Sequence, residues 1–168
     1  MKRMKNALWV AVGLATACGS AMAQSYGGAI IGMTRFDVDC TPFTCNKTDT
    51  GYKFYGGRHL TDKIAVEMAY TQFGTVRVSG VDSVEASAVS IVGALRLPIW
   101  NDVNGVVRLG VAYINKRAKV IESDTTVSAY GGLGLEYAMN KNIKLQAVVD
   151  ATDHGNGMLY GLGLQADF

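Results

Sequence analysis

The residues best suited to covalent chemistry are one serine, two histidines and their acidic neighbours. Asp82 precedes Ser83, and the only histidines of the sequence are His59 and His154. A hydroxyl nucleophile needs a base within about 3 Å, so catalysis would require one of these histidines to reach Ser83. His154 follows Asp153 on a glycine-rich stretch, and two such side chains are too few for a specific metal site. Whether serine and histidine meet depends on the elements that carry them.

Cys40 and Cys45 form a second pair of reactive side chains, with four residues between them. In an oxidising compartment such a pair can close a tight loop, and we expect a disulfide there. A pair of free thiols is the alternative, and a metal site is not expected because no histidine or further cysteine lies near. So short a ring should stabilise the fold by less than the ~3 kcal/mol of a loop of roughly 15 residues. We therefore expect it to stiffen one loop.

The first residues indicate export. A positively charged start is followed by an apolar stretch and then by a small-x-small pattern. These features are Lys2, Arg3 and Lys5, then 7–17, then Ala21-Met22-Ala23. They predict a signal peptide over 1–23 that is cleaved after Ala23. The remaining 24–168 is short enough to form a single domain.

Two other fates of the N-terminal segment are disfavoured. The apolar stretch is too short for an anchor helix, which must cross about 30 Å of hydrocarbon. Lipoprotein processing at Cys18 is disfavoured because 15–17 lack the usual leucine. Cleavage would remove three of the 16 Lys and Arg residues, which leaves 13 against 14 Asp and Glu. This near-neutral balance gives no reason to expect a nucleic-acid partner.

The rest of the chain alternates between apolar and polar residues with a period of two, and turn residues interrupt the alternation. We predict eight strands, most of them as long as a tilted membrane strand needs. They are 26–36, 50–60, 64–74, 84–97, 105–115, 125–138, 143–151 and 158–168. The connections are 37–49, 61–63, 75–83, 98–104, 116–124, 139–142 and 152–157.

Long and short connections alternate, which is typical of an up-and-down barrel with short periplasmic turns and longer outer loops. An even number of strands places both ends of the domain on the periplasmic side. The predicted fold is therefore all-β: an eight-stranded antiparallel up-and-down transmembrane β-barrel that follows a cleaved signal peptide.

Alternation alone does not say which face of the sheet is inside. A soluble lipocalin-like barrel would turn its apolar face inward, whereas a membrane barrel turns it toward lipid. Three features favour lipid: small residues on the polar face, aromatic residues near strand ends on the apolar face, and a final strand that ends on Phe168. The aromatic residues are Tyr70, Tyr113, Tyr137, Tyr160 and Phe168.

With this sidedness, several charged side chains point into the lumen. They are Lys53, Glu67, Arg96, Arg108, Glu136, Lys144 and Asp150. A lone buried charge is prohibitive, but paired charges are tolerated, so mixed signs indicate a network of ion pairs. The interior of an eight-stranded barrel is just wide enough for side chains to fill, which favours a plugged lumen. A narrow pore whose ion pairs rearrange is the alternative.

The segments 49–57, 60–67 and 70–74 resemble the second and third strands of OmpA-like transmembrane domains, and the resemblance extends over 24–168. Tyr160, Leu162, Leu164 and Phe168 are similar to the C-terminal signal that the outer-membrane insertion machinery reads. The resemblance implies a monomer in the outer membrane of a Gram-negative bacterium, in contact with lipid and lipopolysaccharide and without a cofactor. Because the sequence ends at Phe168, we do not expect the family's peptidoglycan-binding domain. The Cys40 to Cys45 loop lies outside the family pattern.

The sequence leaves three functions open. The leading hypothesis is a non-enzymatic barrel that contributes to envelope integrity, with weak solute passage as an addition. The second is an adhesin that acts through its outer loops. The third, a lipid A-modifying enzyme, is disfavoured because Ser83 lies in an outer loop while His59 lies at the periplasmic end of its strand, and 37–49 has no histidine. Four basic residues near the outer rim are candidates for lipopolysaccharide contact: Arg77, Lys116, Arg117 and Lys119.

Overall fold

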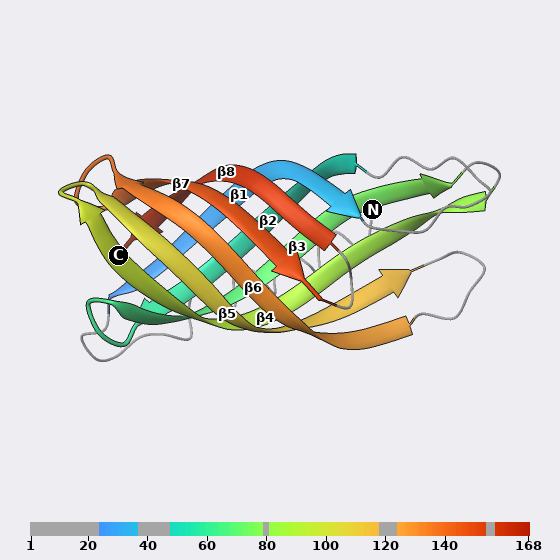
Figure 1. The fold of residues 1–168 in the computed structure, drawn as a ribbon, viewed down its shortest axis with the longest axis horizontal. Helices are drawn as coiled ribbons and strands as arrows, with labels where there is room; N and C mark the ends of the chain where they lie inside the picture. Colours follow the sequence, from blue (N-terminus) through green and yellow to red (C-terminus); the bar gives the residue numbers. More distant parts are fainter. Residues whose placement is uncertain (1–23, 37–47, 79–80, 118–123, 154–156) are drawn as a thin grey trace.

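The computed structural model describes residues 24–36, 48–78, 81–117, 124–153 and 157–168. Eight strands follow one another along the chain and close into one antiparallel barrel in the order β1 to β8 (Figure 1). They are β1 (Ser25–Phe36), β2 (Thr48–His59), β3 (Ile64–Val78), β4 (Val81–Trp100), β5 (Val103–Arg117), β6 (Asp124–Ala138), β7 (Ile143–Thr152) and β8 (Gly157–Asp167). The predicted eight-stranded up-and-down barrel is confirmed.

Closure depends on the first and last strands. β1 pairs with β8 from Tyr26 opposite Asp167 to Phe36 opposite Gly157. Backbone bonds between Ser25 and Phe168 extend this ladder by one more pair, at 2.9 and 3.1 Å. In hydrocarbon an unpaired backbone group costs several kcal/mol, so a sheet is stable there only when no edge is left open. Among the described residues, no helix is long and apolar enough to cross a bilayer.

Two predicted connections are shorter than expected because the strands continue through them. β3 reaches Val78 and β4 begins at Val81, so most of the predicted loop 75–83 is a paired hairpin that extends beyond the barrel wall (Figure 1). The predicted connection 98–104 is a turn at Asn101 and Asp102, and β4 runs through Pro98 to Trp100. Proline cannot donate to a ladder, and a register shift between Pro98 and Trp100 accommodates it.

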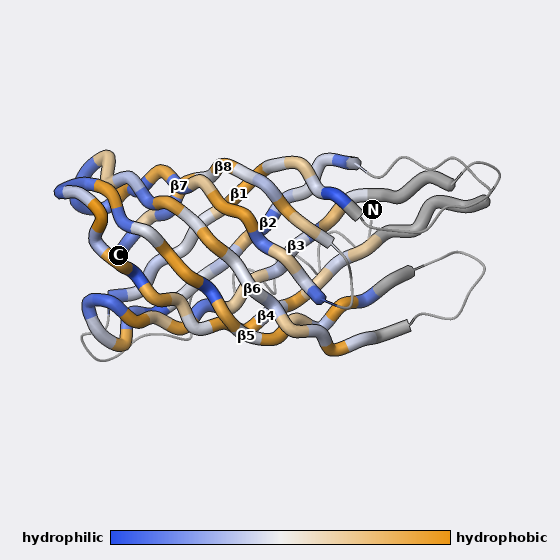
Figure 2. Tube along the Cα trace, in the orientation of Figure 1, coloured by the Kyte–Doolittle hydropathy of each residue, from blue (hydrophilic) through white to orange (hydrophobic). Residues whose placement is uncertain are grey.

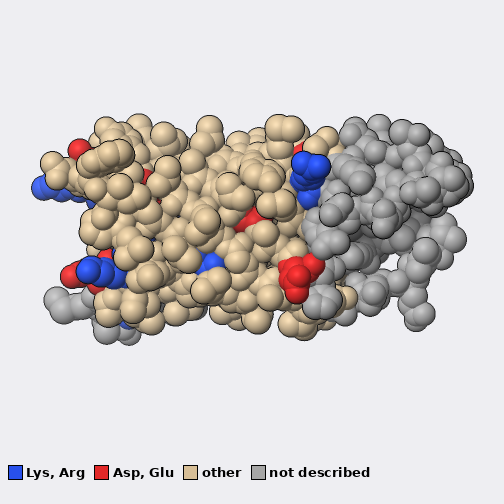
Figure 3. All heavy atoms as spheres, in the orientation of Figure 1, with Lys and Arg blue, Asp and Glu red and all other residues tan. Residues whose placement is uncertain are grey.

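The two faces of the sheet differ in the way the alternation predicts. Outward side chains are apolar, and Leu133, Leu135 and Leu162 are more than half exposed. In the tube view apolar and polar residues alternate along the strands (Figure 2). The space-filling view shows a broad band with few charges between charged groups at its left end and others beside the grey residues (Figure 3). The predicted aromatic residues Tyr70, Tyr113, Tyr137, Tyr160 and Phe168 are all exposed on this outer face.

Glycine makes room for two lumen tyrosines near the start of β1 and the end of β2. The ring of Tyr26 lies against Gly57, where a Cβ atom would come within 2.5 Å of its Cζ. The ring of Tyr55 lies against Gly28 in the same way. The two rings are 6.4 Å apart in an edge-to-face arrangement. These glycines therefore set where the polar tips of both tyrosines can reach.

Candidate functional site

The inward residues of neighbouring strands bring the predicted charges together inside the barrel. Glu67 on β3 is 1% exposed and lies at the centre of the cluster. Its carboxylate accepts hydrogen bonds from Arg108 Nε at 2.7 Å, from Arg96 Nη2 at 3.4 Å and from the Tyr26 hydroxyl at 2.8 Å. The guanidinium of Arg96 also lies over the Tyr26 ring, 4.6 Å from its centroid. Side chains from three strands, β1, β4 and β5, thus donate to one carboxylate of β3.

Glu136 on β6 is the second carboxylate of the cluster. It accepts from Arg96 Nε at 3.1 Å and from Gln146 Nε2 at 2.7 Å, and it forms a longer ion pair with Arg108 Nη2 at 3.9 Å. The two arginines are therefore shared between Glu67 and Glu136 rather than paired one to one. Removing any one of the four charges would leave its partners unbalanced in a buried site.

A separate ion pair lies nearer the middle of the barrel. Lys53 Nζ on β2 lies 2.8 Å from Asp150 Oδ2 on β7 and donates to the Tyr130 hydroxyl at 2.7 Å. Gly132 leaves space for the Asp150 carboxylate, which a Cβ atom at that position would overlap. The pair links β2 and β7, which are three strands apart around the closed sheet.

Amide side chains continue the network toward the periplasmic mouth. Gln146 Nε2 donates to Gln165 Oε1 at 2.8 Å, and Gln165 Nε2 donates to Asp167 Oδ1 at 2.6 Å. Asp167 also pairs with Lys144 Nζ at 2.6 Å. The Tyr55 hydroxyl donates to Gln146 Oε1 at 2.7 Å. The polar network, defined by these contacts and the ion pairs above, takes side chains from all eight strands.

The polar network is electrically balanced in the described part of the chain. Its cations are Lys53, Arg96, Arg108 and Lys144, and its anions are Glu67, Glu136, Asp150 and Asp167. All except Lys144 have at most 5% of the side chain exposed. A buried charge is tolerated when it is paired and hydrogen-bonded, so the balance lets polar residues fill the interior.

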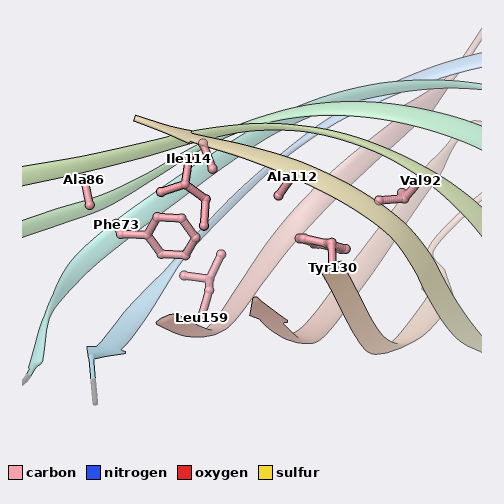
Figure 4. Close-up of a cluster of buried hydrophobic side chains, with 8 residues drawn as sticks. Phe73, Ala86, Val92, Ala112, Ile114, Tyr130 and Leu159 are labelled. Atoms are coloured by element: carbon pink, nitrogen blue, oxygen red, sulfur yellow. The ribbon is translucent and has the colours of Figure 1, made fainter. Parts of the chain in front are cut away.

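The outer half of the lumen is filled differently. Phe73, Ile114 and Leu159 point toward one another near the outer ends of β3, β5 and β8 (Figure 4). Each is at most 4% exposed. Small side chains complete this apolar layer, which comprises Phe73, Ala86, Ala88, Val92, Ala112, Ile114, Tyr130 and Leu159. Tyr130 belongs to both regions, since its hydroxyl accepts from Lys53.

All seven charged residues predicted for the lumen lie there, with Lys144 at its periplasmic mouth. Five further members of the polar network were not predicted from the sequence: Tyr26, Tyr55, Gln146, Gln165 and Asp167. The alternation along each strand shows that these residues face inward. It does not show which residues they contact, because that depends on the register of strands in the closed barrel. The apolar layer was also missed.

The remaining predicted residues lie elsewhere. Tyr160, Leu162, Leu164 and Phe168 face outward on the last strand and at its end. Arg77 lies in the outer part of β3, and Lys116 and Arg117 end β5. Cys40, Cys45, Lys119 and His154 lie outside the described residues. Ser83 lies near the outer start of β4, whereas His59 ends β2 at the opposite, periplasmic end, so these two do not meet.

A family model described as the OmpA-like transmembrane domain matches residues 20–150. The chain belongs to this family. No curated protein matches it. Family and fold together place this OmpA-like barrel in the outer membrane.

Several solved outer-membrane barrels share the fold. The N-terminal barrel domain of Pseudomonas aeruginosa OprF has a TM-score of 0.62 at 18% identity, covering 88% of this chain and all of that one. Ail, the attachment invasion locus protein of Yersinia pestis, has a TM-score of 0.61 at 16% identity with the same coverage. Neisserial surface protein A has a TM-score of 0.64 at 9% identity, again over 88% of this chain and all of its own. Identities this low support the fold alone.

Proposed function

We propose that this barrel is a closed, non-enzymatic protein of the outer membrane that contributes to envelope integrity. The observation that carries the proposal is the filled lumen. The balanced polar network occupies its periplasmic half, and the apolar layer occupies its outer half. With the interior occupied, the lipid-facing wall and the outer ends of the strands are the surfaces left for function.

Weak solute passage, which the sequence left open, would need both layers to open. Glu67 and Glu136 share two arginines, so moving one side chain would leave other buried charges unpaired. An enzyme acting on lipid A would need a base beside a nucleophile, and the positions of Ser83 and His59 at opposite ends of the barrel speak against it.

The test is outer-membrane permeability in the native host. A strain that lacks the gene should become more sensitive to detergent and to bulky antibiotics, and the wild-type gene should restore resistance. A variant without 38–48 should restore it equally, because the barrel wall is intact. Unchanged sensitivity in the deletion strain would refute the proposal, as would a lipid A mass profile altered by overexpression.

Adhesion is a second candidate, favoured by the hairpin of β3 and β4 that extends beyond the barrel. Ail, one of the proteins that share this fold, is by its name an attachment protein. If the first loop mediates adhesion, deleting 38–48 or replacing Cys40 and Cys45 with serine should abolish attachment to host cells while the barrel stays folded. Attachment that survives both changes would rule out the first-loop version.

Contact with lipopolysaccharide is part of the proposal. Arg77, Lys116 and Arg117 belong to the outer ends of β3 and β5, and Lys119 follows in the connection. Basic residues at this level lie where lipid phosphates are abundant.

A further inference from the structure

A groove runs along the outer face of β7, between the ridges of β6 and β8. Its volume is about 740 Å³, within the roughly 300–1,000 Å³ that small-molecule sites occupy. Ala147 and Val149 form its floor, since both are less exposed than the leucines beside them. Leu133 and Leu135 of β6 form one wall. The other wall is formed by Tyr160 and Leu162 of β8 with Ile31 and Met33 of β1.

The strand register shows that this groove has a closed end and an open end. On the periplasmic side the next outward row is Tyr137, Leu145, Leu164 and Ala29, and its three members on β6, β7 and β8 are bulky. On the outer side the next row is Gly131, Ala151, Met158 and Arg35. The first two residues of that row are small, so no bulky side chain of β6 or β7 closes the groove toward the outer surface.

Arg35 gives the open end a positive charge. It follows Ile31 and Met33 along the outward face of β1, and its side chain is exposed. Asp153 is exposed beyond the outer end of β7, so a negative charge lies on the β6 and β7 side of the opening. An anionic group would therefore settle on the β8 and β1 side, next to Arg35.

The groove floor and its small-residue continuation, from Ala147 to Ala151, span about 13 Å at the usual strand rise of ~3.3 Å per residue. Because membrane strands tilt by roughly 35–45°, this span covers about 10 Å of depth, which is most of the roughly 15 Å of one leaflet. An apolar groove of this length with a cation at its outer mouth matches an amphiphile that has an acyl chain and a phosphate. A second copy of the chain fits poorly, because a two-fold contact would set groove against groove and leave a void.

We propose that this groove binds one lipid A moiety of outer-leaflet lipopolysaccharide, with an acyl chain over Ala147 and Val149 and a phosphate on Arg35. The site is separate from the basic residues at the ends of β3 and β5, and it does not depend on the role in envelope integrity. The part of the wall from β6 to β1 would then bind one lipid specifically, while the rest of the outer face contacts lipid without selectivity.

The test is native mass spectrometry of the protein extracted from outer membranes in mild detergent. The wild type should retain one lipid A per barrel. Ala147→Leu should fill the groove and lower the bound fraction at least fivefold, and Arg35→Gln should lower it severalfold while Arg35→Lys preserves it. Ala29→Leu, an outward alanine of β1 outside the groove, and Lys141→Gln, in a periplasmic turn, are the matched controls and should retain the lipid.

A second arm identifies the source of the phosphate. Refolded protein is incubated with phosphatidylethanolamine vesicles that contain either lipid A or phosphatidylglycerol, and heat-modifiable migration on a gel verifies that each variant is folded. Lipid A should be retained in preference to phosphatidylglycerol. Equal or preferred retention of phosphatidylglycerol, a dimer without lipid, no retained lipid, or an Ala147→Leu variant that binds like the wild type would each overturn the proposal.

Discussion

At the scale of single residues, Glu67 shows how a charge can be kept inside a membrane barrel. Two guanidinium groups and one hydroxyl satisfy its carboxylate, and it is almost completely buried. In such a site the interaction of each charge depends on the others, because water cannot replace a missing partner. The stability of the barrel should therefore respond strongly to the loss of this one carboxylate.

Glu67→Gln should lower the free energy of unfolding by about 3–5 kcal/mol, because Arg96 and Arg108 would lose a buried counterion. Equilibrium unfolding in urea, in lipid vesicles, measures the change. The matched control is Asp62→Asn in an exposed periplasmic turn, which should change stability by less than about 0.5 kcal/mol. Equal stability of the two variants would show that the polar network does not support the fold.

Gly57 offers a second residue-scale prediction. In Gly57→Ala the new methyl group would push the Tyr26 ring aside and break its hydrogen bond to Glu67, at an expected loss of about 1–3 kcal/mol. Gly56→Ala is the control, since the nearest neighbour of its Cβ would be a carbonyl oxygen at an ordinary 3.7 Å. In a Tyr26→Leu background the effect of Gly57→Ala should shrink. An undiminished effect would assign it to the backbone instead.

At the scale of elements, the period-two alternation predicted every strand, because lipid outside and a packed lumen inside impose opposite demands on successive residues. The ends of strands were less predictable. The segment 75–83 was predicted as a loop, yet β3 continues to Val78, β4 begins at Val81 and the two strands stay paired. The predicted connection 98–104 begins at Pro98, but a register shift lets β4 continue past this residue to Trp100. Such features depend on the neighbouring strand, which local sequence does not specify.

The hairpin itself yields a prediction at this scale. Within the described residues, 81–84 pairs with β3 alone, whereas β4 pairs with β5 from Glu85 onward. Replacing 76–84 with a short Asn-Gly turn should therefore leave the barrel folded and its urea midpoint nearly unchanged. Heat-modifiable migration and the unfolding curve check this. A variant that fails to refold would show that the extension stabilises closure of the sheet.

At the scale of the whole molecule, the barrel is an apolar cylinder around a filled interior. The outer face was predictable from aromatic and leucine positions such as Tyr160 and Leu133. Successive side chains of a strand point to opposite faces, so the alternation within each strand separates its two sides. The contacts inside were not predictable, since Lys53 and Asp150 are 97 positions apart in the sequence and meet only when the barrel closes. The filled lumen leads to the proposed structural role, and the groove along β7 leads to the proposed lipid site.

The most direct test of the filled lumen is conductance across a planar lipid bilayer. Refolded wild-type protein should insert without current steps, because both the polar network and the apolar layer close the interior, while a general porin reconstituted in parallel conducts. Stable, reproducible current steps from the wild-type barrel would contradict the account, since ions would then cross a lumen that these side chains should fill.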